Sequence, residues 1–199
     1  MAKHFGLAVV LSILAALPTT AQEPSRAVAD LARDKIDAIV VAGERERAPQ
    51  APPIRTALTE AEIDAYLRVH GPDVLPQSIT GPEIRIGSER LVRARAIVDL
   101  DAVRRARPRG WRDPLAYITG SVEVVASGRI AADGGIGRAE LESATVAGVS
   151  VPKSVVQELV RFFTVSEERP EGIDLERPFE LPANIQRVVV ERGRVTVVQ

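Results

Sequence analysis

The segment 90–101 alternates between apolar and charged side chains with a period of two. In an extended chain successive side chains point to opposite faces, so this alternation gathers the apolar residues on one face and the Arg and Asp residues on the other. The apolar face carries Val92, Ala94, Ala96, Val98 and Leu100. One buried and one solvated face is typical of antiparallel sheets. The segment therefore predicts a long, half-buried antiparallel strand.

Further extended segments surround this strand. The segment 115–132 is long and alternating, and the glycine-rich turn at 132–135 returns the chain into a strand over 137–146. A shorter alternation occupies 83–86, and a hairpin closes the chain over 185–198. Consecutive strands joined by short turns imply an antiparallel sheet.

Two helices are predicted among the strands. Thr59 and Glu62 match a capping box, which begins a helix that runs to about Val69. Pro152 suits the first turn of a second helix with an apolar stripe. Because the helices fall between hairpins rather than between single strands, the fold class is α+β. We expect a curved antiparallel sheet of hairpins packed against a long helix, with an additional N-terminal helix.

Residues 1–21 have the pattern of a secretory signal peptide. Lys3 and His4 precede an apolar run over 5–17, and small residues precede the expected cleavage after Ala21. The run is shorter than the ~20 apolar residues that cross a bilayer, so cleavage is preferred to an uncleaved anchor. The sequence predicts a periplasmic or otherwise exported protein.

The remaining chain divides into three parts. We expect an N-terminal helix within 22–43, a Pro-rich linker over 44–57 and the main α+β domain over 58–199. The proline content of the linker argues against a helix or a central strand. The sequence leaves open whether the N-terminal helix docks onto the domain or only tethers it.

Composition excludes several classes of function. The chain has 26 Lys+Arg, 27 Asp+Glu and a formal net charge of −1, so it has no global field to attract nucleic acid. The absence of Cys excludes disulfides, thiolate metal sites and a Cys nucleophile. With two His in the chain, one of them in the expected signal peptide, neither a metal site nor a cofactor is expected.

Catalysis has little support. His70 stands at a helix end, where a His usually acts as a cap, and Ser150 lacks the second glycine of a nucleophile elbow. Asp99 and Asp101 share a strand face, but no further oxygen ligand for Ca²⁺ follows nearby. The Gly-rich turn at 134–137 precedes a strand instead of the helix that a phosphate loop needs. We therefore expect no enzymatic activity, and keep a hydrolase using Asp99 or Asp101 with His70 or Ser150 as a third hypothesis.

A cluster of arginines surrounds Trp111 in the segment 104–112. Guanidinium forks match phosphate, and Trp suits the headgroup level of a membrane, so the cluster is a candidate headgroup or anion site. The alternative is a solvated loop in an arginine-rich protein. The candidate residues are Arg104, Arg105, Arg107, Arg109 and Arg112.

The predicted inward faces of the long strands use small residues. These permit close helix packing, and they also leave room for an acyl chain between sheet and helix. Periodicity does not separate the two. The candidate lining of such a groove is Val92, Ala94, Ala96, Val98, Ile118, Val122, Val124, Leu159 and Phe163.

Several short motifs add a family resemblance. They are LTEAEIDAYL at 58–67, LPQSI at 75–79, the strand end VDLD at 98–101, the stretch 128–135, AGVSVP at 147–152 and FELPANI at 179–185. Together they resemble the LmeA-like and YceB-like bacterial envelope proteins, whose fold resembles tubular lipid-binding (TULIP) domains. The resemblance covers about 58–199. The chain departs from the family in lacking a lipobox Cys and in carrying an extra helix and a Pro-rich linker before Thr59.

The resemblance implies a long helix packed into a strongly curved sheet, with an apolar groove that accepts lipid tails without catalysis. It supplies no polar site to carry over. We expect an exported, non-enzymatic protein that binds a lipid or other amphiphile, with peripheral membrane contact and no nucleic-acid partner. The alternative is an envelope structural or adaptor protein with a filled core that docks a protein or cell-wall partner.

Overall fold

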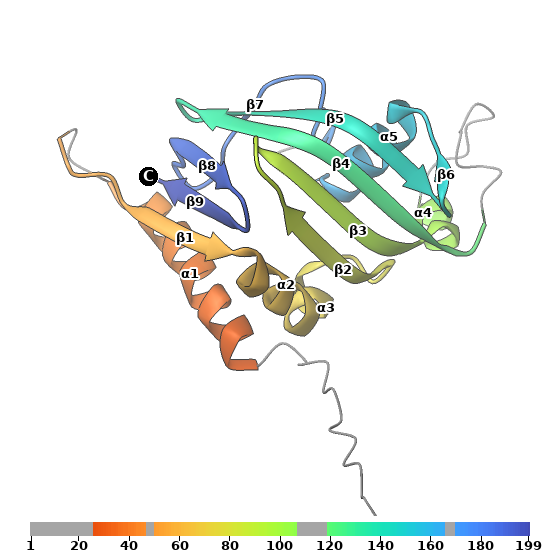
Figure 1. Cartoon of the computed structure of the whole chain (residues 1–199), viewed down its shortest axis with the longest axis horizontal. Helices are drawn as coiled ribbons and strands as arrows, with labels where there is room; N and C mark the ends of the chain where they lie inside the picture. The colour runs from red at the N-terminus through yellow and green to blue at the C-terminus, as the bar shows by residue number, and fades with distance from the viewer. Residues whose placement is uncertain (1–25, 47–49, 107–118, 166–169) are drawn as a thin grey trace, which may run out of the picture.

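The computed structural model describes residues 26–46, 50–106, 119–165 and 170–199. These residues form a mixed α+β structure with one large antiparallel sheet and several helices (Figure 1). The predicted α+β class with an antiparallel sheet is confirmed at this level. The expected signal peptide over 1–21 lies outside the described residues. Within the described part of the chain, no helix combines the length and apolarity needed to cross a membrane.

Within the described residues, nine strands form the sheet, and the pairings between them are antiparallel. The order is β1-β9-β8-β4-β3-β2, and β5 pairs with the other edge of β4 and also with β6 and β7. The bounds are β1 Arg55–Thr59, β2 Ile79–Ile86, β3 Leu91–Asp99, β4 Ser121–Asp133, β5 Ile136–Val146, β6 Val149–Ser150, β7 Phe179–Glu180, β8 Arg187–Glu191 and β9 Arg194–Val198.

The two long segments predicted from their alternation lie side by side as β3 and β4. Val98 stands opposite Val122 in the register, so the apolar side chains of both strands share one face. On the other face Arg95 of β3 lies 2.6 Å from Glu123 of β4 in a cross-strand ion pair. The expected division into an apolar and a charged face holds at Val98 and Arg95, but Ala94 on the apolar face is exposed and Val125, on the face of Arg95, is buried.

The predicted glycine turn joins β4 to β5. Gly134 and Gly135 have φ angles of 58° and 78°, which glycine adopts without steric cost. The predicted C-terminal hairpin is present as β8 and β9, joined at 192–193. These turns fix the antiparallel order of the sheet, and β4 and β5 form its longest hairpin (Figure 1).

One hydrophobic core lies where α5 (Lys153–Phe163) packs on β3, β4 and β5. A short helix, α4 (Leu100–Ala106), contributes two fully buried side chains to it. The buried members are Val98, Leu100, Val103, Val146, Val155 and Leu159. Their contact fills the space between the sheet and this part of α5.

A second core lies at the other end of the sheet, where α1 (Arg26–Glu44) and α2 (Glu60–Val69) pack together against β1 and β9 (Figure 1). Its buried residues are Ala32, Ile39, Leu58 and Val197. The ammonium of Lys35 also donates to the carbonyl of Ala57 on β1, at 2.9 Å. The N-terminal helix is therefore docked on the sheet, which answers the question that its sequence left open.

Acidic side chains of α2 cover the outer edge of β2. Glu60 Oε2 accepts from the N–H of Ile86 at 2.7 Å, and Asp64 Oδ1 accepts from the N–H of Ile84 at 2.8 Å. The capping box predicted at the start of this helix is present. Because an unpaired strand edge invites association with another chain, these contacts protect the edge. The one-turn helix α3 (Gly71–Val74) follows directly.

Part of the segment 44–57, expected as a linker, belongs to the sheet. Residues Arg55–Thr59 form β1 and pair with Arg194–Val198 of β9. A strand of five residues carries too little periodicity to be recognised without its partner, which lies at the far end of the sequence.

The predicted strand over 90–101 extends too far at its C-terminal end. The strand ends at Asp99, and α4 begins at Leu100. Asp99 Oδ1 accepts from the N–H groups of Asp101 at 2.9 Å and Ala102 at 3.0 Å. This is the geometry of a helix N-cap, so the aspartate ends the strand and begins the helix.

Candidate functional site

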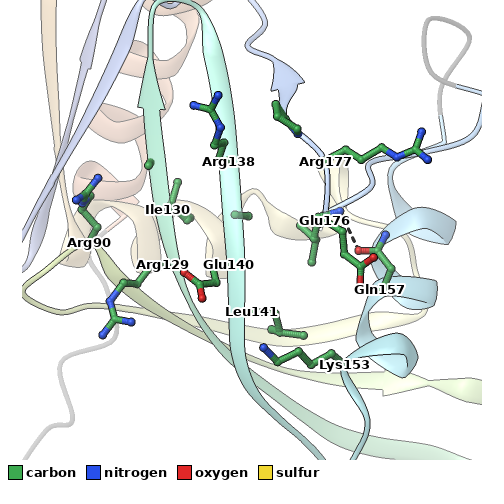
Figure 2. Close-up of a pocket in the computed structure, with 14 residues that line it drawn as sticks. Arg90, Arg129, Ile130, Arg138, Glu140, Leu141, Lys153, Gln157, Glu176 and Arg177 are labelled. Carbon is green, nitrogen blue, oxygen red and sulfur yellow. Dashed lines mark hydrogen bonds between the residues drawn. The ribbon is translucent and has the colours of Figure 1, made fainter.

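A cleft of about 620 Å³ opens between the β4–β5 hairpin, α5 and the segment 175–178. Figure 2 shows the hairpin on one side and α5 on the other. Its volume lies within the range of ~300–1,000 Å³ that is typical of small-molecule sites. The lining residues are Arg90, Arg129, Ile130, Ala131, Arg138, Ala139, Glu140, Leu141, Lys153, Gln157, Leu175, Glu176, Arg177 and Pro178.

The segment 173–175, which leads into the wall of the cleft, is held against α5 by the side chain of Gln157. This buried side chain accepts from the N–H of Leu175 at 2.8 Å and donates to the carbonyl of Ile173 at 3.1 Å (Figure 2). Thr164 lies about two turns further along, at the C-terminal end of α5. Its Oγ1 accepts from the N–H of Ile173 at 2.7 Å. Two side chains of the α5 region thus fix the backbone of 173–175, so the wall is tied to the helix.

An ion pair strengthens the same wall. Arg161 of α5 donates to Asp174 at 2.7 Å. The N–H of Glu176, and then the Arg161 guanidinium, lower the pKa of the Asp174 carboxyl below its usual value, and Asp174 in turn raises the pKa of Arg161. Both partners therefore stay charged at neutral pH, and the wall keeps this contact.

The outer edge of β5 is open where it meets the cleft. This edge pairs with β7 at 136–137 and with β6 at 145–146. Between these pairings, residues 138–143 have no strand partner on that edge within the described part of the sheet. The stretch 138–141 lines the cleft. Backbone donors and acceptors of a strand are therefore available beside an apolar surface.

Cations outnumber carboxylates around the cleft. Five Arg or Lys side chains line it, against Glu140 and Glu176. Arg129 is paired with Glu142, and Arg177 lies 3.7 Å from Asp174. The lining cations that make no ion pair among the described residues are Arg90, Arg138 and Lys153.

The groove residues expected from the sequence lie elsewhere. Val98 and Leu159 are buried in the core beneath α5, with Val122, Val124 and Phe163 packed against them. Val92 and Ala96 are half-buried and Ala94 is exposed, while Ile118 lies outside the described residues. None of the eight described residues of this set lines the cleft. The cleft begins next to the packed core, on the part of the hairpin nearer its turn.

The expected arginine site falls largely outside the described residues. Arg107, Arg109 and Arg112 lie in the segment 107–118, and the side chain of Arg104 is also outside the description. Arg105 is exposed on α4, 3.8 Å from Asp99.

The candidate catalytic residues have structural partners. His70 caps α2, and its Nε2 lies 3.0 Å from Asp30 of α1. Asp99 caps α4, and Asp101 accepts from the N–H of Gly120 at 2.9 Å. Ser150 is exposed on β6, opposite Thr145. Within the described ranges no group of three His, Asp or Glu residues is placed to hold a metal ion.

Sequence reasoning missed the cations of the cleft. Arg138 and Lys153 belong to no charge cluster or motif in the sequence, so each has the pattern of a solvated position on a strand or helix. Both residues line the cleft only because β5 and α5 lie on its two sides, and no local signal in the sequence indicates this arrangement.

A smaller depression of about 350 Å³, with Leu67 and Leu75 in its lining, lies among α2, α3 and the start of β2.

No family model matches the chain, and neither a curated protein nor a solved structure matches it. The function is therefore argued from the site itself.

Proposed function

We propose that this protein binds a lipid or other amphiphile in the cleft between β4, β5 and α5, without catalysing a reaction. The observation that carries the proposal is an apolar surface under a charged rim in one cleft. The apolar part comprises Ile130, Ala131, Ala139, Leu141, Leu175 and Pro178.

Burial of an apolar tail is the driving force in this proposal. Removing apolar surface from water contributes about 25 cal/mol per Å². The polar rim then orients the ligand, since a few placed polar groups in an otherwise apolar pocket set the binding pose. The contacts of Gln157 support a largely pre-formed site, because the wall at 173–175 is already hydrogen-bonded to α5.

The proposal includes the finer architecture and the location. In it, the sheet curves around the cleft, α5 is the helix that closes it, and the chain is an exported protein of the cell envelope with peripheral membrane contact. The apolar run over 5–17 supports export. The resemblance to lipid-binding envelope proteins over 58–199 supports the ligand class.

One observation favours a second candidate, the envelope adaptor with a filled core. The residues expected to line a groove, among them Val98 and Leu159, are packed against α5 instead. In that case a partner protein or cell-wall polymer covers the cleft, and no amphiphile enters it.

A binding experiment separates the two candidates. Purified protein is examined by native mass spectrometry for bound lipid and is titrated with the fluorescent fatty acid cis-parinaric acid. We expect saturable binding that Leu141→Asn weakens by about tenfold or more, because a leucine contact is lost from the apolar floor.

Leu67→Asn is the matched control, because Leu67 lines the smaller depression instead. It should leave the affinity unchanged. Neither bound lipid nor probe binding in the wild-type protein would reject the amphiphile proposal and favour the adaptor. Equal losses in both variants would place binding outside the cleft.

A further inference from the structure

The unpaired cations around the cleft come from three separate elements. Arg90 lies in the turn between β2 and β3, Arg138 on β5 and Lys153 at the start of α5. Arg129 and Arg177 are already matched by Glu142 and Asp174, which do not line the cleft. A bound anion would therefore meet cations that have no carboxylate partner within the part of the chain that the structure describes.

Lys153 connects the charged rim with the apolar floor. Figure 2 shows its side chain extending from α5 toward Leu141 on β5. A lysine stem can lie along apolar surface while its ammonium stays at the water boundary. An amphiphile with its chain against Leu141 would thus bring its headgroup beside this ammonium.

The open edge of β5 supplies further donors. Here β7 and β6 pair with the edge at 136–137 and 145–146, and the stretch 138–141 between them lines the cleft. Backbone N–H groups form strong, charge-assisted hydrogen bonds to oxyanions.

We propose that the amphiphile of the cleft carries an anionic oxyacid headgroup of the phosphate, sulfate or carboxylate class, held by Lys153 beside the β5 edge, while Arg138 adds positive charge further along the same strand. This rests on the proposed function, because it specifies the headgroup of the same ligand. The shared chemistry is an oxyanion, and the apolar chain distinguishes an amphiphile from a free anion.

Calorimetric titration with probes of one chain length tests the proposal. Dodecyl phosphate, dodecyl maltoside and inorganic phosphate are each added below micelle-forming concentrations to the purified protein. We expect dodecyl phosphate to bind about tenfold or more tightly than dodecyl maltoside, and inorganic phosphate to bind weakest. In the double variant Lys153→Gln/Arg138→Gln, this preference should fall to less than about threefold while dodecyl maltoside affinity is kept.

Arg93→Gln is the control, because Arg93 is exposed on β3 and lies outside the cleft lining. It should keep the full preference, and unfolding midpoints should show that all variants are folded. Equal affinity for the two dodecyl probes would overturn the headgroup assignment and leave the proposed function standing. Failure of both dodecyl probes would overturn the proposed function, and tight binding of inorganic phosphate alone would overturn both.

Discussion

Lys35 of α1 and Glu62 of α2 form an ion pair in which Nζ lies 2.7 Å from Oε1. The other carboxylate oxygen of Glu62 accepts from the N–H of Thr59 at 2.8 Å and completes the capping box. One carboxylate therefore serves both the start of α2 and the docking of α1. Its side chain is 11% exposed, so solvent weakens the pair less than it weakens the surface ion pairs.

The first prediction concerns this carboxylate. Glu62→Gln should lower the free energy of unfolding by about 1–2 kcal/mol, because charge-assisted hydrogen bonds are replaced by weaker neutral ones. Urea denaturation measures the change. Glu46→Gln, at an exposed position after α1, is the control and should change the free energy by less than about 0.5 kcal/mol. Equal effects of the two substitutions would contradict the structural role of Glu62.

The second prediction concerns pH. Burial raises the pKa of Glu62, but the hydrogen bonds from Lys35 and Thr59 and the charge of Lys35 outweigh it, so the pKa lies below its ordinary value of 4.5. The folded state therefore prefers the ionised form, and this stabilisation is present above pH 4.5 and is lost as pH falls through the lower pKa of the folded state.

Wild-type protein and Glu62→Gln should accordingly differ by a constant unfolding free energy above pH 4.5, and the gap should shrink at lower pH. Denaturation curves collected across this range test the point. If the difference in unfolding free energy instead grew at lower pH, the pKa of Glu62 in the folded state would be raised and not lowered.

The third prediction concerns the last turn of α1. A Cβ at Gly43 would overlap the backbone of Ala183, which lies between β7 and β8, so α1 approaches this segment closely only because glycine has no side chain. Gly43→Ala should destabilise the protein by about 1–3 kcal/mol through overpacking, although alanine is the better helix former. Thermal unfolding measures the loss. Ala38→Gly, exposed on the same helix, should cost about 1 kcal/mol. A Gly43→Ala variant as stable as the wild type would mean that α1 docks differently.

The fourth prediction concerns the beginning of α4. Asp99→Ala removes the acceptor for the N–H groups of Asp101 and Ala102 and should cost about 1 kcal/mol. Asp99→Asn should recover most of this, since asparagine caps nearly as well as aspartate. Chemical denaturation of both variants is the measurement, and equal losses would argue against capping as the cause.

The sequence predicted strands and turns correctly where a periodic pattern extended over many residues. The alternation on β3 and β4 spans enough residues to identify both strands, and the capping box at Thr59 fixes the start of α2. β1 was missed because its five residues gain their structure from β9.

The buried face of α1 does not follow its larger apolar side chains. Leu31 and Val40 are 49% and 47% exposed. Ala29 and Ala32 are fully buried instead. Small side chains let the helix lie close to its neighbours, and this choice depends on the packing partner, which helical periodicity does not reveal.

The candidate site was harder to predict than the fold. A groove between sheet and helix was expected at residues such as Val98 and Leu159, yet these fill the core. The cleft lies further along the same hairpin, where α5 and the segment 175–178 diverge from β5. Which part of an apolar face is covered depends on the path of a loop, and strand periodicity carries no information on that path.

The amide of Gln199 donates to the carbonyl of Ile39, 160 residues away along the chain. This contact and the pairing of β1 with β9 join the earliest and latest described segments in one core. During synthesis, α1 and β1 are therefore made before their partner β9. The apolar side chains of Ile39 and Leu58 then lack the contacts with β9 that complete their core. Contacts of such large sequence separation form slowly, and the waiting chain is prone to aggregation. Folding of this protein should therefore depend on keeping α1 and β1 from aggregating until the β8–β9 hairpin has been synthesised.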